Sequence, residues 1–278
     1  MRAGTPSRSA VHRFLVGSSL AVAIALLAVR VRALDRGGAL AAATIGTTVF
    51  AAGGLAWAVP MVGFFAAASA LTRLGRRRKR GLVDQHASRP RTAGQVLANG
   101  GVAAVVALLQ LSRQSRRTFR LPYLGALAAA SADTWATELG VLSPSPPRSL
   151  RTGRPVPPGT SGAVSPLGTL AMLAGASLVA RLAPRHVPRL PVFLAGLAGA
   201  FVDSLLGATL QARYYCPRCQ RILETARHAC PQRACRISGL PGLTNDTVNA
   251  LATLTGALVA AVLAAFYENS RRSASASS

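Results

Sequence analysis

The sequence predicts an all-α protein, a polytopic transmembrane bundle of about eight helices with a small four-cysteine loop. Half of the 278 residues are hydrophobic, and they gather in blocks of about 15–22 residues, long enough to cross a bilayer. The 32 Lys and Arg residues lie between these blocks or at their ends. Ala and Gly are abundant while aromatic residues are few, and small residues let membrane helices pack closely.

Eight apolar blocks define the expected helices in chain order. Their approximate bounds are 11–29, 39–52, 55–74, 95–111, 121–142, 166–182, 190–211 and 246–267. Glycines, prolines and basic runs separate them. The second and third blocks are short, so a re-entrant hairpin is an alternative for this pair. Pro60 is expected to kink the third helix or to lie in its early turns. Residues 1–278 are expected to form one integral membrane domain.

The distribution of basic residues predicts how the protein is oriented. With eight helices the loops alternate between two faces, and one face carries 20 Lys and Arg residues against 12 on the other. Because the more basic face of a membrane protein is usually cytoplasmic, we expect that face inside the cell. The membrane is the cell membrane, or a plastid membrane in a eukaryote. Most polar motifs lie toward this face, so the active face is expected to be cytoplasmic.

The net charge of +24 indicates which binding partners to expect and says little about the fold. In a soluble protein it would suggest nucleic acid. Here the arginines lie in loops between apolar blocks, which favours membrane lipid headgroups and phosphorylated substrates instead. Nucleic acid is therefore not expected as a partner.

The most informative segment is ADTWATELG, residues 132–140, which closes the fifth apolar block. The chain has only eight acidic residues, and a carboxylate at membrane depth costs about 2.5–3.5 kcal/mol on insertion scales. Each acid could simply satisfy a neighbouring helix, but several together favour function. Asp84 also lies at the mouth of such a segment. The predicted catalytic residues are Asp133, Glu138, Asp203 and Asp246.

Amides, hydroxyls and arginines accompany these acids. Residues 95 and 99 share one helical face, as do residues 246, 249 and 253. A flexible GTSG turn, residues 159–162, precedes a helix start, where backbone N–H groups suit an anion. Helix packing and ordinary turns are the alternatives. The predicted substrate- or nucleotide-binding residues are Arg80, Arg89, Arg91, Gln95, Asn99, Thr160, Ser161 and Asn249.

Hard oxygen ligands near many arginines suit a site for Mg²⁺ and a nucleotide, because Mg²⁺ binds one or two carboxylates together with phosphate oxygens. Phosphoryl transfer needs mainly positioning and charge stabilisation. The four histidines, His12, His86, His186 and His228, are scattered in basic segments and are interpreted as solvated. A transporter whose intramembrane acids bind an ion is the alternative, as is a non-catalytic membrane protein.

Five motifs, in order, resemble the transmembrane protein 19 family, which includes plant phytyl-phosphate kinase. They are QVLANGG, ADTWATELG, PGTSGAVSPLGTL, FVDSLLGATLQARYYC and LTNDTVNALATLTGA, within residues 37–267. The resemblance implies an integral membrane phosphotransferase, and it adds Gln211 and Asn245 to the predicted substrate- or nucleotide-binding residues. Its expected reaction moves the γ-phosphate of CTP or ATP, with Mg²⁺, to a phytyl or prenyl monophosphate.

All four cysteines lie in one loop, residues 213–238, between the seventh and eighth helices. They are Cys216, Cys219, Cys230 and Cys235. Two cysteine pairs at this spacing resemble a zinc ribbon, so we expect a closed structural Zn²⁺ site with all four as ligands. Two disulfides are the alternative if the loop faces an oxidising compartment.

Overall fold

The computed structural model describes residues 8–75, 78–79, 90–112, 119–228 and 230–276. These residues include eight long helices whose bounds follow the apolar blocks, so the all-α fold class is confirmed. The helices are α1 (Arg8–Arg30), α2 (Arg36–Gly53), α3 (Leu55–Arg73), α5 (Ala93–Ser112), α6 (Arg120–Gly140), α7 (Pro166–Leu182), α8 (Arg189–Thr209) and α9 (Asn245–Ala276).

Five of the described helices, α1, α3, α5, α8 and α9, are long and apolar enough to cross a membrane. Helix α7 is apolar but shorter, with 17 residues. Helices α2 and α6 are not among the five, and α6 carries Arg120, Asp133 and Glu138 within its 21 residues. Pro60 lies in the second turn of α3, one of the two positions expected for it.

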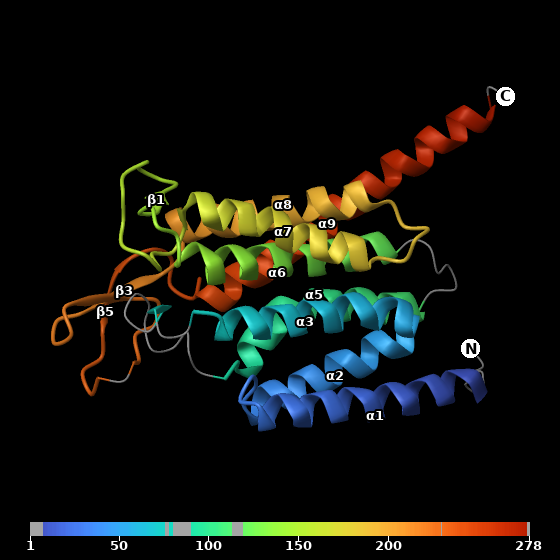
Figure 1. Cartoon of the computed structure of the whole chain (residues 1–278), viewed down its shortest axis with the longest axis horizontal. Helices are drawn as coiled ribbons and strands as arrows, with labels where there is room; N and C mark the ends of the chain where they lie inside the picture. The colour runs from blue at the N-terminus through green and yellow to red at the C-terminus, as the bar shows by residue number, and fades with distance from the viewer. Residues whose placement is uncertain (1–7, 76–77, 80–89, 113–118, 229, 277–278) are drawn as a thin grey trace.

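Successive helices run back and forth along the long axis of the molecule (Figure 1). Gly54, with a φ of 59°, turns the chain between α2 and α3, which are separate helices. Helices α1, α2 and α5 pack in sequence on one side, while α6 contacts α3, α5, α7, α8 and α9. Helix α6 is therefore the central helix, and every residue from Pro122 to Ala132 is buried.

Small residues allow α6 to be surrounded on all sides. On one side, the Tyr123 ring stacks on Trp57 of α3 with ring centroids 4.3 Å apart, and its hydroxyl donates to the Trp57 carbonyl at 2.6 Å. On another, Gly125 lies directly against the backbone of Gly256 in α9.

Gly125→Ala is expected to destabilise the bundle, because the added Cβ would clash with the Gly256 carbonyl and with Ala260. Overpacking of this kind costs about 1–3 kcal/mol. The matched control is Gly101→Ala on α5, where an added Cβ meets nothing within 4 Å. Thermal unfolding in detergent should show a lower Tm for Gly125→Ala only. Equal Tm values for the two variants would contradict this packing.

The strands are confined to two loops at one end of the bundle (Figure 1). Strands β1 (Arg148–Ser149) and β2 (Ala163–Val164) pair in the loop between α6 and α7. Between α8 and α9, β3 (Arg213–Cys216), β4 (Arg221–Leu223) and β5 (Cys235–Ser238) form an antiparallel sheet in the order β4-β3-β5. Those of the predicted polar residues that the structure describes lie toward this end.

Candidate functional site

One end of the bundle collects the polar motifs, because helices of alternating direction bring distant segments together there. Helices α3, α6 and α8 end at this side, and α5, α7 and α9 begin there (Figure 1). The predicted convergence on one end is observed for the described residues. Asp84, Arg80 and Arg89 lie outside the described residues.

The centre of this end is a pair of carboxyl groups. The side chains of Asp133 on α6 and Asp203 on α8 lie close enough to influence each other's charge. The Oδ2 atom of Asp203 is buried and has no hydrogen-bond partner among the described residues. Within the described part of the chain, two adjacent acids with an unsatisfied oxygen and no ion-pair partner form a site suited to a positively charged ligand.

A third carboxylate, Glu224, contributes to the electrostatic environment of this pair. It follows β4 and accepts hydrogen bonds from the Ser161 hydroxyl at 2.6 Å and from Gln211 Nε2 at 3.3 Å. Arg213 at the start of β3 connects the cysteine loop to the GTSG turn and to α8, since its guanidinium donates to the carbonyls of Ser161 and Gly207. The GTSG turn and the cysteine loop therefore meet at Glu224.

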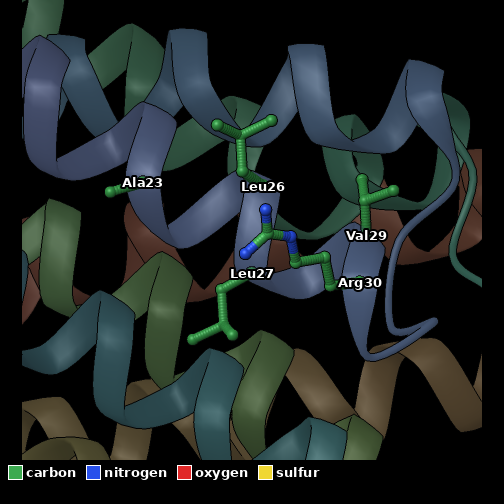
Figure 2. A pocket seen from close by; sticks show the side chains of 5 residues that line it. All are labelled: Ala23, Leu26, Leu27, Val29 and Arg30. Carbon is green, nitrogen blue, oxygen red and sulfur yellow. The ribbon is translucent and has the colours of Figure 1, made fainter.

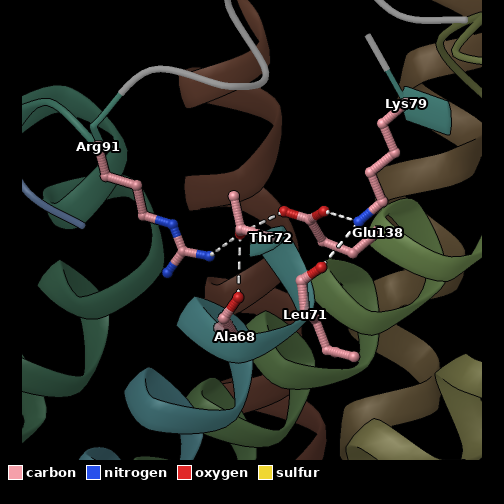
Figure 3. Close-up of polar contacts among 6 residues, drawn as sticks. All are labelled: Ala68, Leu71, Thr72, Lys79, Arg91 and Glu138. Carbon is pink, nitrogen blue, oxygen red and sulfur yellow. Dashed lines mark hydrogen bonds and ion pairs between the residues drawn. The ribbon is translucent and has the colours of Figure 1, made fainter. Parts of the chain in front are cut away.

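Glu138, the second acid of the ADTWATELG motif, has partners of its own (Figure 3). Its carboxylate forms an ion pair with Lys79 at 2.6 Å and accepts a hydrogen bond from the Thr72 hydroxyl at 2.5 Å. Lys79 also donates to the Leu71 carbonyl at the end of α3. Since Glu138 is five residues from Asp133, the two acids point about 140° apart around α6. Glu138 therefore lies apart from the carboxyl pair.

Arg91 is held beside this ion pair by the turn between α1 and α2. Its backbone N–H donates to Ala33, and its carbonyl accepts from Asp35. Its guanidinium reaches Thr72 at 3.4 Å (Figure 3). Burial lowers the pKa of the Arg91 guanidinium from its usual value, and Glu138 partly offsets that effect. Arg91 remains a cation at neutral pH.

Asp246, in the first turn of α9, packs against α5. A Cβ placed on Gly94 would lie 2.6 Å from an oxygen of its carboxylate. Further along the same face of α9, the Thr253 hydroxyl donates to the Ala98 carbonyl of α5. The face predicted for residues 246, 249 and 253 is thus the one that joins α9 to α5.

Several predicted binding residues make local contacts. Gln95 and Thr92 form a reciprocal cap at the start of α5, with side-chain to backbone distances of 3.1 and 3.5 Å. Asn99 donates to the Gln95 carbonyl, and Thr160 donates to Pro157. The start of α7 is capped by Ser165. Asn245 and Asn249 lie in the first two turns of α9.

Sequence reasoning missed Lys79 and Glu224, although both carried a signal. Lys79 is the single lysine among the 32 basic residues, and Glu224 is one of only eight acids. Lys79 fell within a basic run that resembles a solvated loop. Glu224 fell within a loop that the cysteines dominate. Rarity within the composition was the signal that distinguished each from its neighbours.

The cysteine loop differs from the predicted set of four cysteines. The described residues bring together Cys216, Cys219, Cys230 and His228, whose candidate ligand atoms all lie within 4.8 Å of one another. Cys235 is exposed and outside this group, and all four cysteines are free thiols. His228, interpreted from sequence as solvated, takes its place. Strand geometry explains the exchange: Cys235 pairs with Tyr215, so its side chain lies on the sheet face opposite to that of Cys216.

An apolar hollow on α1 lies outside these groups (Figure 2). It is lined by Ala23, Leu26, Leu27, Val29 and Arg30. Leu26 and Leu27 are each 60% exposed, which suits a helix face turned toward lipid. With no carboxylate and no hydroxyl in its lining, it offers no ligands for a hard metal ion.

Three relatives of this chain are similar over most of their length. "Protein PGR" of Arabidopsis thaliana is 30% identical over 273 residues, covering 87% of this chain and 93% of its own. "Uncharacterized membrane protein MJ0933" of Methanocaldococcus jannaschii is 26% identical over 255 residues, covering 90% and 94%. "Uncharacterized membrane protein sll0875" of Synechocystis is 27% identical over 226 residues, covering 78% and 77%. No solved structure matches the chain.

The family described as integral membrane protein DUF92 matches residues 19–257. This match and the plant relative confirm the family resemblance that the five motifs carry. The chain is therefore a multi-pass integral membrane protein that belongs to the DUF92 family.

Proposed function

We propose that this protein is a membrane-embedded phosphotransferase that moves the γ-phosphate of CTP or ATP to a phytyl or prenyl monophosphate. One observation carries the proposal: Asp133 and Asp203 meet from two different helices at the polar end of the bundle, and among the described residues one carboxylate oxygen has no hydrogen-bond partner. Two acids this close inside a membrane protein must either share a proton or bind a cation, and the proposal takes the cation. This end is proposed to face the cytoplasm, where nucleotides are available.

The residues present fit Mg²⁺ bound together with a nucleotide. Mg²⁺ prefers carboxylate oxygens and takes only one or two of them, leaving its other positions to phosphates and water. Asp133 and Asp203 would supply these oxygens, and Glu224 adds negative charge nearby. Bound Mg²⁺ would neutralise charge on the transferring phosphoryl group. Glu138 is excluded from this role because Lys79 already neutralises it.

In the proposed reaction, an oxygen of the acceptor monophosphate attacks the γ-phosphorus of the nucleotide. The bond to the bridging oxygen between the β- and γ-phosphates breaks, and the nucleoside diphosphate leaves with that oxygen. A phosphate monoester has a second pKa of about 6 and is already ionised at neutral pH, so no side chain needs to remove a proton. The protein must instead bring two anions together, for which Arg91, Arg80 and Arg89 are the proposed cations.

A transporter is the less favoured alternative. Its binding site would be expected near the bilayer midplane, between two repeats with broken helices. Asp133 and Asp203 lie 7 and 6 residues before the ends of α6 and α8, in the half of each helix that faces the loops carrying Glu224 and the GTSG turn. This location supports access from the aqueous side of the membrane.

The proposal is tested with purified protein in detergent, Mg²⁺, labelled CTP or ATP, and a panel of prenyl monophosphates. Transfer of label to lipid is expected from wild type. The rate should rise as pH increases through about 6 and then level off, following ionisation of the acceptor. A protein that transfers no label to any monophosphate, or that accepts only free prenyl alcohols, would contradict the proposed reaction.

A further inference from the structure

We propose that the loop between α8 and α9 binds one structural Zn²⁺ ion through the thiolates of Cys216, Cys219 and Cys230 and the imidazole of His228, with Cys235 excluded. The candidate ligand atoms lie within 4.8 Å of one another. Sulfur ligands 2.3 Å from a tetrahedral Zn²⁺ lie about 3.8 Å apart, so small side-chain shifts would close the site. This inference does not depend on the proposed kinase activity.

The backbone positions two of the thiols. Cys216 ends β3 and pairs with Arg221 of β4, so residues 217–220 form the turn between the strands. Gln220 adopts a left-handed φ of 51°, which returns the chain to β4. Within the turn, the backbone N–H of Cys219 donates to Cys216 Sγ at 3.5 Å. An N–H group directed at sulfur stabilises the thiolate that a metal requires.

His228 completes the cluster from the other side. Its Nε2 atom lies 3.5 Å from Cys219 Sγ. Three thiolates and one imidazole are a common ligand set for structural zinc. A disulfide is the competing use of two close thiols, but all four cysteines are free.

The loop needs such a crosslink, because its own hydrophobic core is very small. Cys216, Leu223 and Ala234 are the buried residues of this cluster, with Tyr214 and Cys230 packed against them. A segment this short buries little apolar surface of its own, and small units of this kind usually depend on metals or disulfides.

The zinc site also bears on the polar end of the bundle. Strand β4 leads directly from the metal-binding turn to Glu224, which is bound to Ser161 and Gln211. Zinc would therefore fix the strand that carries this third carboxylate. The zinc ion is structural, holds the segment that carries Glu224 in place, and is separate from any Mg²⁺ at the carboxyl pair.

The decisive experiment compares His228→Asn and Cys230→Ser with the matched control Cys235→Ser. Full-length protein is purified in detergent under reducing conditions, and its zinc content is measured by mass spectrometry. We expect about one zinc per chain in wild type and in Cys235→Ser, and loss of most of it in the other two. Size-exclusion profiles and far-UV circular dichroism verify that the helical bundle is intact in each variant.

Two further readouts make the outcome specific. A Co²⁺-substituted wild type should show tetrahedral absorption bands that are unchanged in Cys235→Ser. Removal of zinc by a chelator should speed tryptic cleavage of residues 213–238, which contain six arginines. Zinc lost from Cys235→Ser but kept in His228→Asn would overturn this ligand set in favour of four cysteines. Absence of zinc from folded, reduced wild type would overturn the site itself.

Discussion

Asp203→Asn and Asp133→Asn should each abolish most of the proposed phosphotransfer while leaving the protein folded. Each substitution removes one anionic oxygen ligand from the only described pair of acids that meet inside the bundle. A bound metal ion contributes several kcal/mol to stabilising transition-state charge, which corresponds to a rate loss of about 10²–10³-fold. The dependence of rate on Mg²⁺ concentration should weaken at the same time.

The double variant Asp133→Asn/Asp203→Asn should be scarcely worse than either single variant, because residues that act as a unit show non-additive effects. The matched control is Asp35→Asn at the same end of the bundle. Asp35 caps α2 by accepting from the Gly38 N–H at 2.6 Å, and Asn is an equally good cap. Asp35→Asn should therefore keep wild-type activity.

The same substitutions should not lower stability, and this separates a binding role from a structural one. In the metal-free protein the pair leaves one buried carboxylate oxygen unsatisfied, so Asp203→Asn should show a Tm equal to or above that of wild type in a chelating buffer. A variant that binds Mg²⁺ and nucleotide normally yet loses the chemical step would contradict the ligand role and point to a general base. A large drop in Tm would point to a structural pair.

Lys79→Met should have the largest effect on stability. Lys79 and Glu138 are 10% and 19% exposed, and their charged atoms lie 2.6 Å apart. Removing one partner of a buried pair leaves an uncompensated charge and costs about 3–5 kcal/mol. Glu138→Gln should be damaging for the same reason, because the ammonium group of Lys79 then loses the negative charge that it pairs with.

The double variant Lys79→Met/Glu138→Met should recover much of the loss, since replacing both partners of such a pair by apolar residues is often close to neutral. Arg78→Met is the matched control, because Arg78 is adjacent in sequence but exposed. It should change the free energy of unfolding by no more than about 0.5 kcal/mol. The measurement is denaturation in detergent for all four variants. If the double variant loses as much free energy of unfolding as the two single variants combined, the two side chains do not stabilise the protein as an ion pair.

The helices, their order and the end of the bundle where the polar residues gather could be predicted from the sequence. Apolar block length is sufficient for this, because a helix in lipid must satisfy its own backbone and a block of about 20 residues spans the bilayer. Alternation of direction then brings residues 95, 138, 203 and 246 to one end without any knowledge of packing. The bounds of α7 were predicted to the residue, whereas α9 continues past its apolar block to Ala276.

Which polar residues meet was decided only by the tertiary structure. The rotation of α6 turns Asp133 toward α8 and Glu138 toward Lys79. The five-residue spacing of the two acids in the sequence does not indicate which neighbouring helix each of them faces. In the cysteine loop, strand register turns Cys235 away and folds His228 in, although spacing alone favours four cysteines. Apolar periodicity is a local property that one segment expresses by itself, but the partner of a buried charge depends on how neighbouring elements rotate as they pack.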